Sequence, residues 1–354
     1  MTDLEKLCSR VTEAADCAVI TDDVNRRYFT AMKSSAGTLV AFPEKAYFII
    51  DFRYIEKAKK TVTACEVILQ DKLYEQINSL IKKHGAKTVS VNADTCTLSE
   101  LIAYQQKLNA EVIADTKLAE IIREIRTVKS QEQIDKIIKA QRIAEKGFAH
   151  MLDFIRVGRT EKEIQLELDY YMLKNGAEAL SFDTIALSGS NTSLPHGVPS
   201  DKKVESGEFV LVDFGATYDG WHSDMTRTVC VGKPSDKMKS VYETVLTAQL
   251  SALDAVKAGM SGKALDKIAR DIITEAGYGD NFGHSLGHGV GVEIHESPYA
   301  SPSREDILPE NSIVTVEPGI YLEGKFGVRI EDFVVVTENG CINMTKAPKE
   351  LICL

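Results

Sequence analysis

Three of the seven histidines of the chain, His284, His288 and His295, lie within one short glycine-rich stretch. Two kinds of chemistry fit this stretch. Gly283-His284-Ser285-Leu286-Gly287 matches the G-x-S-x-G pattern of a nucleophilic serine, which requires a strand before the serine and a helix after it. The histidines alternatively belong to a metal site or to a site of general acid and base catalysis.

The residues that follow Ser285 argue against the serine nucleophile. Three of the next six residues are glycine, and glycine at this density breaks a helix. The fold that uses the motif also places an acid on a separate loop between the serine and a later histidine. Glu293 is the one acid between Ser285 and His295. The stretch therefore favours the metal or acid–base interpretation.

A hairpin signal brings two aspartates together. Asp219-Gly220 is a strong two-residue turn, and pairing around this turn places Gly215 opposite Asp224. Asp213 points to the same face as Gly215, so Asp213 and Asp224 become diagonal neighbours about 7–8 Å apart. Two carboxylates at this spacing need a cation or a shared proton. The alternative is a pair of solvated aspartates on an exposed sheet face.

Two glutamates, Glu317 and Glu331, lie within apolar, strand-like runs. A carboxylate buried by such neighbours needs a partner. Arg329 has the same strand parity as Glu331, so a simple salt bridge is one alternative. Asp332 points to the opposite face and is expected to be structural.

Together with His288, these four acids form a candidate set of five metal ligands: Asp213, Asp224, His288, Glu317 and Glu331. An oxygen-rich set of this kind is suited to two divalent ions and favours Mn²⁺-like metals over structural zinc. Two ions about 3.5–4 Å apart lower the pKa of a water held between them.

Composition narrows the function classes. A length of 354 residues predicts about two domains. A net charge of −10 without a Lys/Arg tract argues against nucleic-acid binding. We see no signal-peptide pattern and no apolar run near the roughly 20 residues of a membrane helix. The seven scattered cysteines, never spaced C-x-x-C, indicate reduced thiols. These features predict a cytoplasmic protein with no membrane or nucleic-acid partner.

The elements that must position these residues fall into two parts. Over residues 1–123, short apolar runs alternate with helical patterns, which predicts an α/β domain. Residues 124–354 begin with a helix after a capping box at Ser130 and Gln133, and a second helix starts at Thr160. The helices of this second part are interleaved with hairpin-like runs, including 289–296, which predicts an α+β domain with a curved antiparallel sheet.

Four motifs carry a resemblance to a known family: VDFGATYDGWHSDMTRTV, GHSLGHGVGVEIHESP, TVEPGIYL and GVRIEDFVVV. The sequence resembles the pita-bread metallopeptidases, in the Xaa-Pro branch that contains aminopeptidase P and prolidase. The resemblance covers essentially the whole chain. It implies a pita-bread catalytic domain over 124–354 and a creatinase-like N-terminal α/β domain over 1–123. Trp221 stands where the family commonly has tyrosine, a mild departure on the flank of the hairpin.

The resemblance also implies roles for the site residues. The five ligands named above would hold two divalent ions, with Asp224 and Glu331 bridging. The expected ion is Mn²⁺, with Co²⁺ or Zn²⁺ as alternatives. Glu317 would exchange the proton of the attacking water. The residues that match substrate-handling positions of the family are His196, His284, His295 and Arg329. Of these, His196 and His295 would also take part in catalysis.

The implied reaction is hydrolysis of the peptide bond before proline. The short stretch between Glu317 and Glu331 offers few cations and no evident barrier, so we expect an Xaa-Pro aminopeptidase that accepts tripeptides and longer peptides. An Xaa-Pro dipeptidase (prolidase) is the alternative, followed by a non-peptidase interaction protein of the same fold. The expected partners are a proline-containing peptide and, by resemblance, a second copy of the chain in a homodimer.

Overall fold

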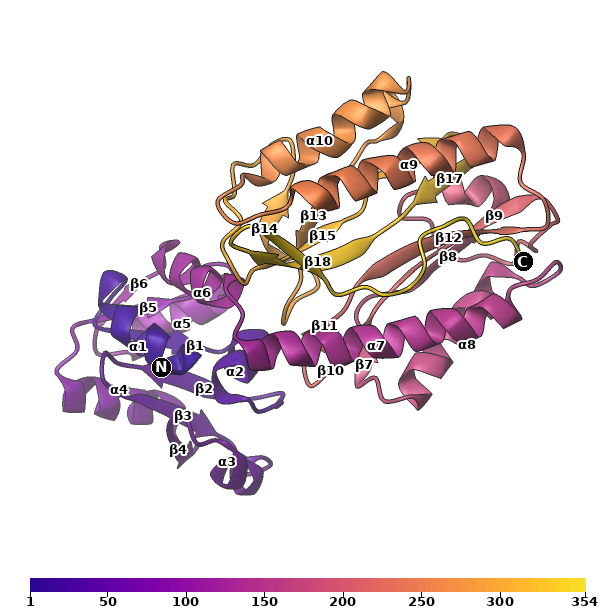
Figure 1. Cartoon of the computed structure of the whole chain (residues 1–354). Coiled ribbons are helices and arrows are strands. Elements are labelled where there is room, and N and C mark those ends of the chain that lie inside the picture. Colours follow the sequence, from indigo (N-terminus) through magenta and orange to yellow (C-terminus); the bar gives the residue numbers. More distant parts are fainter. The chain divides into compact units, whose positions relative to one another are not determined.

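The computed structural model describes all 354 residues and divides the chain into two compact units, Met1–Arg126 and Thr127–Leu354 (Figure 1). The division falls at the end of helix α6 (Lys117–Thr127). The sequence places the boundary slightly earlier, after residue 123, where the helical pattern is still running.

The N-terminal unit has one six-stranded sheet with a core on each face, which confirms the predicted α/β class. The strand order is β4-β3-β2-β1-β5-β6, with β1 antiparallel to β2 and parallel to β5. Within β1, Ala18 and Ile20 pack into one core and Cys17 and Val19 into the other. Strands that are buried on both faces read as continuous apolar runs.

The strands of this unit are β1 (Cys17–Ile20), β2 (Thr38–Ala41), β3 (Ala46–Ile50), β4 (Glu66–Leu69), β5 (Thr88–Val91) and β6 (Glu111–Ile113). Its remaining helices are α1 (Asp3–Arg10), α2 (Asp23–Thr30), α3 (Ile55–Thr61), α4 (Leu73–His84) and α5 (Leu98–Lys107), with a 3₁₀ turn at Val11–Glu13.

The second unit packs two pairs of helices on opposite sides of antiparallel sheets (Figure 1). The helices are α7 (Gln131–Phe154), α8 (Glu161–Lys174), α9 (Asp236–Ala255) and α10 (Gly262–Glu275). Separate cores lie beneath α7 and α8 and beneath α9 and α10. This arrangement confirms the predicted α+β domain. Capping boxes open α7 at Ser130 and α8 at Thr160, as the sequence indicates.

The strands of the second unit are short, and every pair that they form with one another is antiparallel. They are β7 (Ala179–Leu180), β8 (Ile185–Ser188), β9 (Glu208–Phe214), β10 (Ala216–Tyr218), β11 (Trp221–His222), β12 (Met225–Val231), β13 (Gly287–Gly289), β14 (Glu296–Ala300), β15 (Ile313–Val316), β16 (Gly319–Leu322), β17 (Phe326–Arg329), β18 (Asp332–Thr337) and β19 (Gly340–Asn343). Two 3₁₀ turns, η2 (Gly189–Ser193) and η3 (Gly279–Asn281), connect them.

The hairpin around Asp219-Gly220 has the predicted register. Both turn residues have positive φ, 49° and 82°, as a tight hairpin turn requires. Tyr218 pairs with Trp221, and further from the turn Phe214 pairs with Met225. Gly215 lies between these pairs, and a Cβ there would stand 1.9 Å from the carbonyl oxygen of Ser223. The close approach of the two backbones therefore requires glycine at this position.

Two features differ from the sequence-based expectation. Residues 291–295 form bends instead of the expected strand, because the glycines at 289 and 291 let the chain fold tightly back. A Cβ on Gly291 would lie 2.1 Å from the carboxylate of Glu296. Helix α9 was missed from the sequence, and its N-cap Ser235 is followed at the third helical position by Met238 instead of the Glu or Gln of a capping box.

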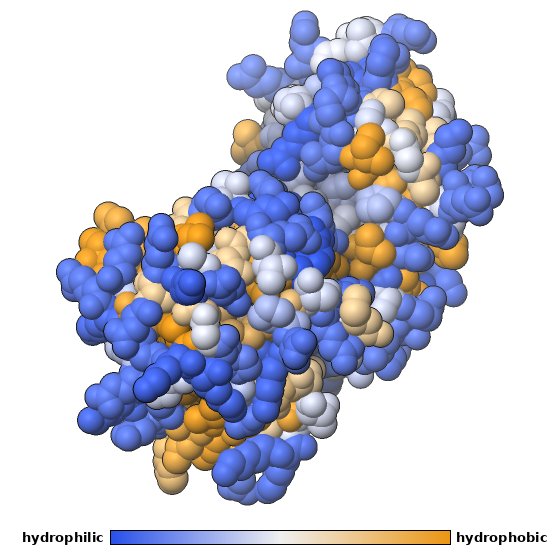
Figure 2. Space-filling model, turned by 90° about the vertical axis from the view of Figure 1, so that its left-hand side faces the viewer, coloured by the Kyte–Doolittle hydropathy of each residue, from blue (hydrophilic) through white to orange (hydrophobic).

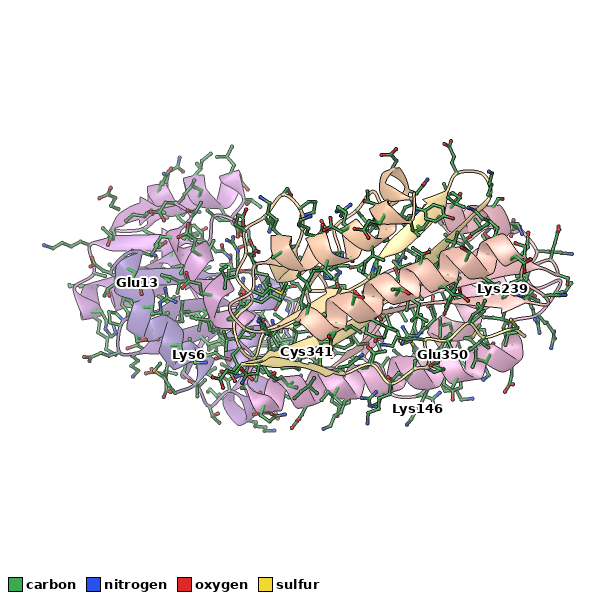
Figure 3. The ribbon with its side chains drawn as sticks, turned by 45° about the horizontal axis from the view of Figure 1, so that its top comes forward. Lys6, Glu13, Lys146, Lys239, Cys341 and Glu350 are labelled. Atoms are coloured by element: carbon green, nitrogen blue, oxygen red, sulfur yellow. The ribbon has the colours of Figure 1, made fainter.

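Charged side chains lie on the outer helical layers of the second unit. Lys146 of α7 and Lys239 of α9 project from the outer helical layers in Figure 3. On the face in Figure 2, apolar residues are interspersed with hydrophilic ones. None of the helices combines the length and apolar character needed to cross a membrane.

Candidate metal centre

The five predicted ligands come from five different strands or strand ends of the second unit. Asp213 lies in β9 and His288 in β13, whereas Asp224 immediately precedes β12, Glu317 follows β15 and Glu331 immediately precedes β18. Two of the five thus lie within strands. The other three stand where regular strand pairing stops.

The side chains of this ligand group converge around the imidazole of His288. Ligand atoms of Asp224, His288 and Glu331 all lie within 4.8 Å of one another. His288 Nε2 is 3.5 Å from Asp224 Oδ2 and 3.3 Å from Glu317 Oε1. Asp213 belongs to the same electrostatic group, because its charge raises the pKa of Asp224 after the larger effect of burial.

The ligand group carries an excess of buried negative charge. Burial, followed by repulsion from neighbouring carboxylates, raises the pKa values of Asp224 and Glu331 well above their ordinary range. Burial also raises the pKa of Asp213, and its Oδ1 atom is buried without any hydrogen-bond partner. One guanidinium, that of Arg329, and one imidazole face four carboxylates. Buried anions in such excess need a further cation, so these residues fit divalent metal ions.

The backbone around His288 prepares its Nε2 atom for a metal. His288 Nδ1 donates a hydrogen bond to the carbonyl oxygen of Gly289, at 3.1 Å. This hydrogen bond leaves the Nε2 lone pair directed at the carboxylates, an arrangement common behind metal-bound histidines. Although burial lowers it, the pKa of His288 rises to about 9 through its hydrogen bond to Glu317 and the nearby carboxylates. The same contact lowers the pKa of Glu317 to about 2 despite its burial.

These pKa directions predict that metal binding competes with protons. At pH 7 the metal-free group keeps a proton on His288, the raised pKa values of Asp224 and Glu331 favour their protonated forms, and a metal must displace the protons that these groups hold. The raised pKa of His288 also stabilises the folded metal-free protein. This contribution is fully present below about pH 6.5 and is lost as the pH rises through about 9. At a fixed Mn²⁺ concentration, we therefore expect a larger increase in melting temperature at pH 8 than at pH 5.5.

Thermal unfolding with and without Mn²⁺ at both pH values measures this difference. For each proton that the metal expels, the affinity for Mn²⁺ should fall about tenfold when the pH is lowered by one unit. An increase that is equal at the two pH values would show that the ions bind elsewhere, at groups that are already deprotonated.

A series of hydrogen bonds beside the ligand group connects Arg329 with His284. Arg329 donates from Nη2 to Asp213 Oδ2 (2.5 Å) and from Nη1 to the hydroxyl of Tyr321 (2.6 Å). Tyr321 in turn lies 2.9 Å from His284 Nε2, and His284 Nδ1 lies 2.8 Å from the carbonyl oxygen of Ser285. Arg329 is 3% exposed. Its partner is Asp213, so the salt bridge to Glu331 that strand parity allowed is wrong.

Tyr321 is a site residue that the sequence analysis missed, although it lies in the TVEPGIYL motif. Its hydroxyl joins Arg329 to His284, and both ring nitrogens of His284 already have partners within the chain. Its position, four residues after the candidate ligand Glu317, was the one signal in the sequence that pointed to the site. A tyrosine in an apolar strand, however, is indistinguishable from a core residue by pattern alone.

The two remaining histidines lie at the exposed rim of the ligand group. His295 packs edge-on against His288, with ring centroids 4.3 Å apart. His196 is exposed in the turn after η2. After burial, the main cause, the charge of His196 contributes to lowering the pKa values of both His284 and His295. The structure therefore gathers all four predicted histidines around one site.

Asp332, which follows Glu331 in the sequence, faces away from the ligand group, as strand parity predicts. It is fully buried and accepts hydrogen bonds from Arg227 Nη2 and Lys349 Nζ, both at 2.8 Å. Arg227 also donates to the carbonyl oxygen of Glu331, whose side chain accepts from Thr226 Oγ1 at 2.7 Å. A buried ion pair thus fixes the strand end that carries a candidate ligand.

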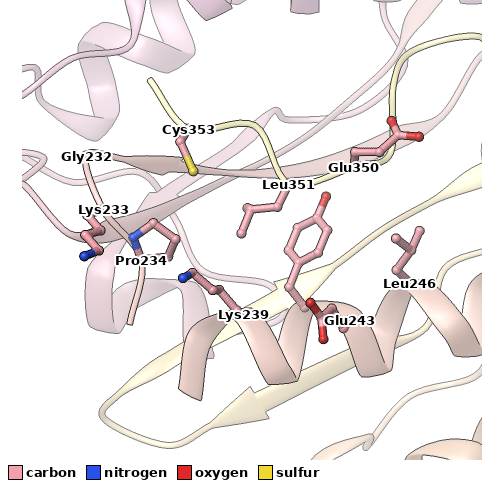
Figure 4. A pocket seen from close by; sticks show the side chains of 10 residues that line it. Gly232, Lys233, Pro234, Lys239, Glu243, Leu246, Glu350, Leu351 and Cys353 are labelled. Atoms are coloured by element: carbon pink, nitrogen blue, oxygen red, sulfur yellow. The ribbon is translucent and has the colours of Figure 1, made fainter. Parts of the chain in front are cut away.

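A separate cavity of about 690 Å³ lies between α9 and the C-terminal segment (Figure 4). It is lined by Lys233, Lys239, Tyr242 and Cys353 among others, and none of the predicted site residues borders it. The chemistry described above is therefore confined to the ligand group and its rim.

Comparison with known proteins gives matches along nearly the whole chain. The description "Creatinase/Prolidase N-terminal domain" matches residues 4–128, and "Metallopeptidase family M24" matches residues 135–338. The Xaa-Pro dipeptidase of Pyrococcus furiosus is 40% identical over 99% of both chains. A solved Xaa-Pro dipeptidase from Bacillus anthracis superposes with a TM-score of 0.95 at 42% identity, over 99% of both chains. A solved X-Pro aminopeptidase from Thermotoga maritima gives 0.90 at 39% identity, covering 96% of this chain and 98% of its own.

Proposed function

Because the chain belongs to metallopeptidase family M24, we propose that it is an Xaa-Pro dipeptidase, which cleaves the bond before the proline of a dipeptide. The observation that carries this proposal is the full-length similarity to proteins named Xaa-Pro dipeptidase, at 40% and 42% identity. The aminopeptidase expected from the sequence becomes the second candidate. The similarity to the Thermotoga maritima X-Pro aminopeptidase keeps it open.

The aminopeptidase expectation rested on the short stretch between Glu317 and Glu331. That stretch forms the β16–β17 hairpin, which turns at Gly324 with a φ of 67°. A short hairpin limits what can block the substrate on this one side of the site. Selection for a dipeptide requires a cation or a barrier against longer chains, and residues elsewhere in the chain can supply either.

The proposed metal centre comprises Asp213, Asp224, His288, Glu317 and Glu331. Bound there, two divalent ions, Mn²⁺ in this proposal, would supply Lewis-acid activation of the scissile carbonyl and a lowered pKa for the attacking water. Both contacts of Glu317, with His288 and with Thr315 Oγ1, involve its Oε1 atom. Its Oε2 atom is therefore placed to accept the proton of the water and to return it to the leaving nitrogen.

The exposed imidazoles would handle the substrate. His295, at the edge of His288, is placed to donate a hydrogen bond to the oxygen that gains negative charge during attack. Burial lowers the pKa of His295, so a neutral ring donates this bond. His196, which is also exposed, would hold the peptide. His284 and Arg329, whose polar atoms are engaged within the chain, would act by positioning Tyr321 and Asp213.

Peptide length separates the two candidate functions. We expect the enzyme to cleave Xaa-Pro dipeptides with a kcat/KM at least about tenfold above that for Xaa-Pro-Yaa tripeptides with the same first residue, since tenfold corresponds to about 1.4 kcal/mol of transition-state stabilisation. A charged hydrogen bond to the proline carboxylate supplies a difference of this size.

The assay compares the two peptide lengths under identical metal loading, and an Xaa-Ala dipeptide serves as the control for the proline requirement. Efficient cleavage of tripeptides with dipeptides refused would assign the aminopeptidase function instead. A homodimer stays a prediction, which light scattering of the purified protein tests.

A further inference from the structure

The segment that carries His196 leaves the protein core at Ser188 and returns at Ser200. It begins with η2, and a turn closed by a hydrogen bond from Gly197 N to the carbonyl oxygen of Leu194 (3.1 Å) then presents His196. We refer to residues 189–199 as the His196 loop. His196 itself is exposed, so whatever holds the loop determines where its imidazole stands.

Both ends of the His196 loop are bonded to the same side chain, that of Glu161. Glu161 Oε1 accepts hydrogen bonds from the backbone N–H and the hydroxyl of Ser188, at 2.7 and 3.2 Å. Glu161 Oε2 accepts from the backbone N–H and the hydroxyl of Ser200, at 3.0 and 2.6 Å. The amide of Asn191, within the loop, reaches both oxygens at 3.0 and 3.2 Å.

Glu161 is a buried acid whose donors are all neutral. Its side chain is 0% exposed, and a buried carboxylate is costly unless hydrogen bonds replace its hydration. Four donor groups in the loop ends and the amide of Asn191 fill its acceptor sites. Its position at the first turn of α8 adds the favourable field of a helix N-terminus. The acid is therefore built to organise backbone and not to form an ion pair.

The middle of the His196 loop contacts the strand that carries Arg329. The backbone N–H of Gly327 donates to Thr192 Oγ1 at 2.8 Å. Arg329 Nη1 lies 3.4 Å from the carbonyl oxygen of Pro195, the residue before His196. The loop thus spans from Glu161 to the rim of the ligand group, and a displacement at its ends is transmitted to His196.

We propose that Glu161 is a positioning residue that fixes His196 over the metal centre by clamping both ends of the His196 loop. The inference rests on the proposed role of His196 in holding the substrate. It extends the site to an acid that bonds to none of the candidate ligands and contacts no substrate.

The test combines Glu161→Gln with His196→Ala in a double-mutant cycle on the metal-loaded enzyme. A glutamine keeps the shape but turns one acceptor into a donor, which then faces the donors of either Ser188 or Ser200. We expect kcat/KM for an Xaa-Pro dipeptide to fall about 100-fold, the cost of a misplacement near 1 Å, with metal content unchanged. In the His196→Ala background the same change should cost less than about threefold, because the positioned group is gone.

Hydrogen exchange provides the second readout, and Glu167→Gln is the matched control. Glu167 lies on the same helix and bonds His150 at 2.6 Å, so its loss removes a charged hydrogen bond without touching the His196 loop. Amides of residues 189–199 should exchange faster in Glu161→Gln but not in Glu167→Gln. If Glu161→Gln fails to fold, Ser200→Ala removes one donor and should act in the same direction.

Equal losses of kcat/KM in both backgrounds, or an unchanged kcat/KM in Glu161→Gln, would overturn the proposal. So would unchanged exchange in the loop. Failure of the proposed function has a different signature: the wild-type enzyme would refuse Xaa-Pro dipeptides, while exchange in the loop would still report whether Glu161 clamps it.

Discussion

Replacement of His288 with alanine is expected to remove bound metal and peptide hydrolysis together. His288 Nε2 lies within 3.5 Å of both Asp224 and Glu317, and a methyl group offers no lone pair in its place. The loss in kcat/KM should be on the order of 10⁴-fold, since metal-ion catalysis contributes several kcal/mol and each 1.36 kcal/mol is tenfold. Elemental analysis and the dipeptide assay on the same preparation measure both effects.

Ser285→Ala is the matched control, three residues away in the same stretch. The chain after Ser285 enters β13 and not a helix, so the structure lacks the strand–serine–helix arrangement of a nucleophilic serine. The hydrogen bond of His284 uses the carbonyl oxygen of Ser285, which alanine retains. We expect Ser285→Ala to keep most of its activity. An inactive Ser285→Ala enzyme with full metal content would restore the serine hypothesis.

Exhaustive chelation is the second change with a large expected effect. Without ions, burial and like charges raise the pKa values of Asp224 and Glu331, and the site has no Lewis acid to polarise the scissile carbonyl or to activate a water. Hydrolysis should fall to background. Addition of Mn²⁺ or Co²⁺ should restore it, since both suit an oxygen-rich donor set with one imidazole.

Restoration by a series of divalent metals, each added to protein shown by elemental analysis to be metal-free, identifies the effective ions. Mg²⁺ provides a control for ionic strength and charge. Full activity in protein verified as metal-free is the result that would end the two-metal interpretation, whatever the peptide specificity.

Sequence reasoning found the candidate ligands because strand geometry is regular. Asp219-Gly220 fixed the hairpin register, and that register then fixed which faces Asp213 and Asp224 share. The same parity separated Glu331 from Asp332. In each case a local rule, the two-residue period of a strand, was sufficient to place a side chain.

The parts that sequence reasoning missed depend on contacts between distant segments. Glu161 and Tyr321 each act through partners that lie far along the chain or across the sheet, such as Ser200 and Arg329. No local pattern distinguishes a glutamate that organises a loop from one that caps a helix. Strand parity allowed a salt bridge between Arg329 and Glu331, whereas the fold brings Asp213 of another strand to the guanidinium.

The adjacency of Glu331 and Asp332 has a consequence for how this protein can change over time. One acid faces the ligand group and the next is buried against Arg227, so gain or loss of a single residue just before them would exchange their faces. Substitutions nearby alter one side chain at a time, but a change in length inverts both roles together. Insertions and deletions in descendants of this chain should therefore accumulate at the exposed β16–β17 turn and be excluded between Arg329 and Asp332.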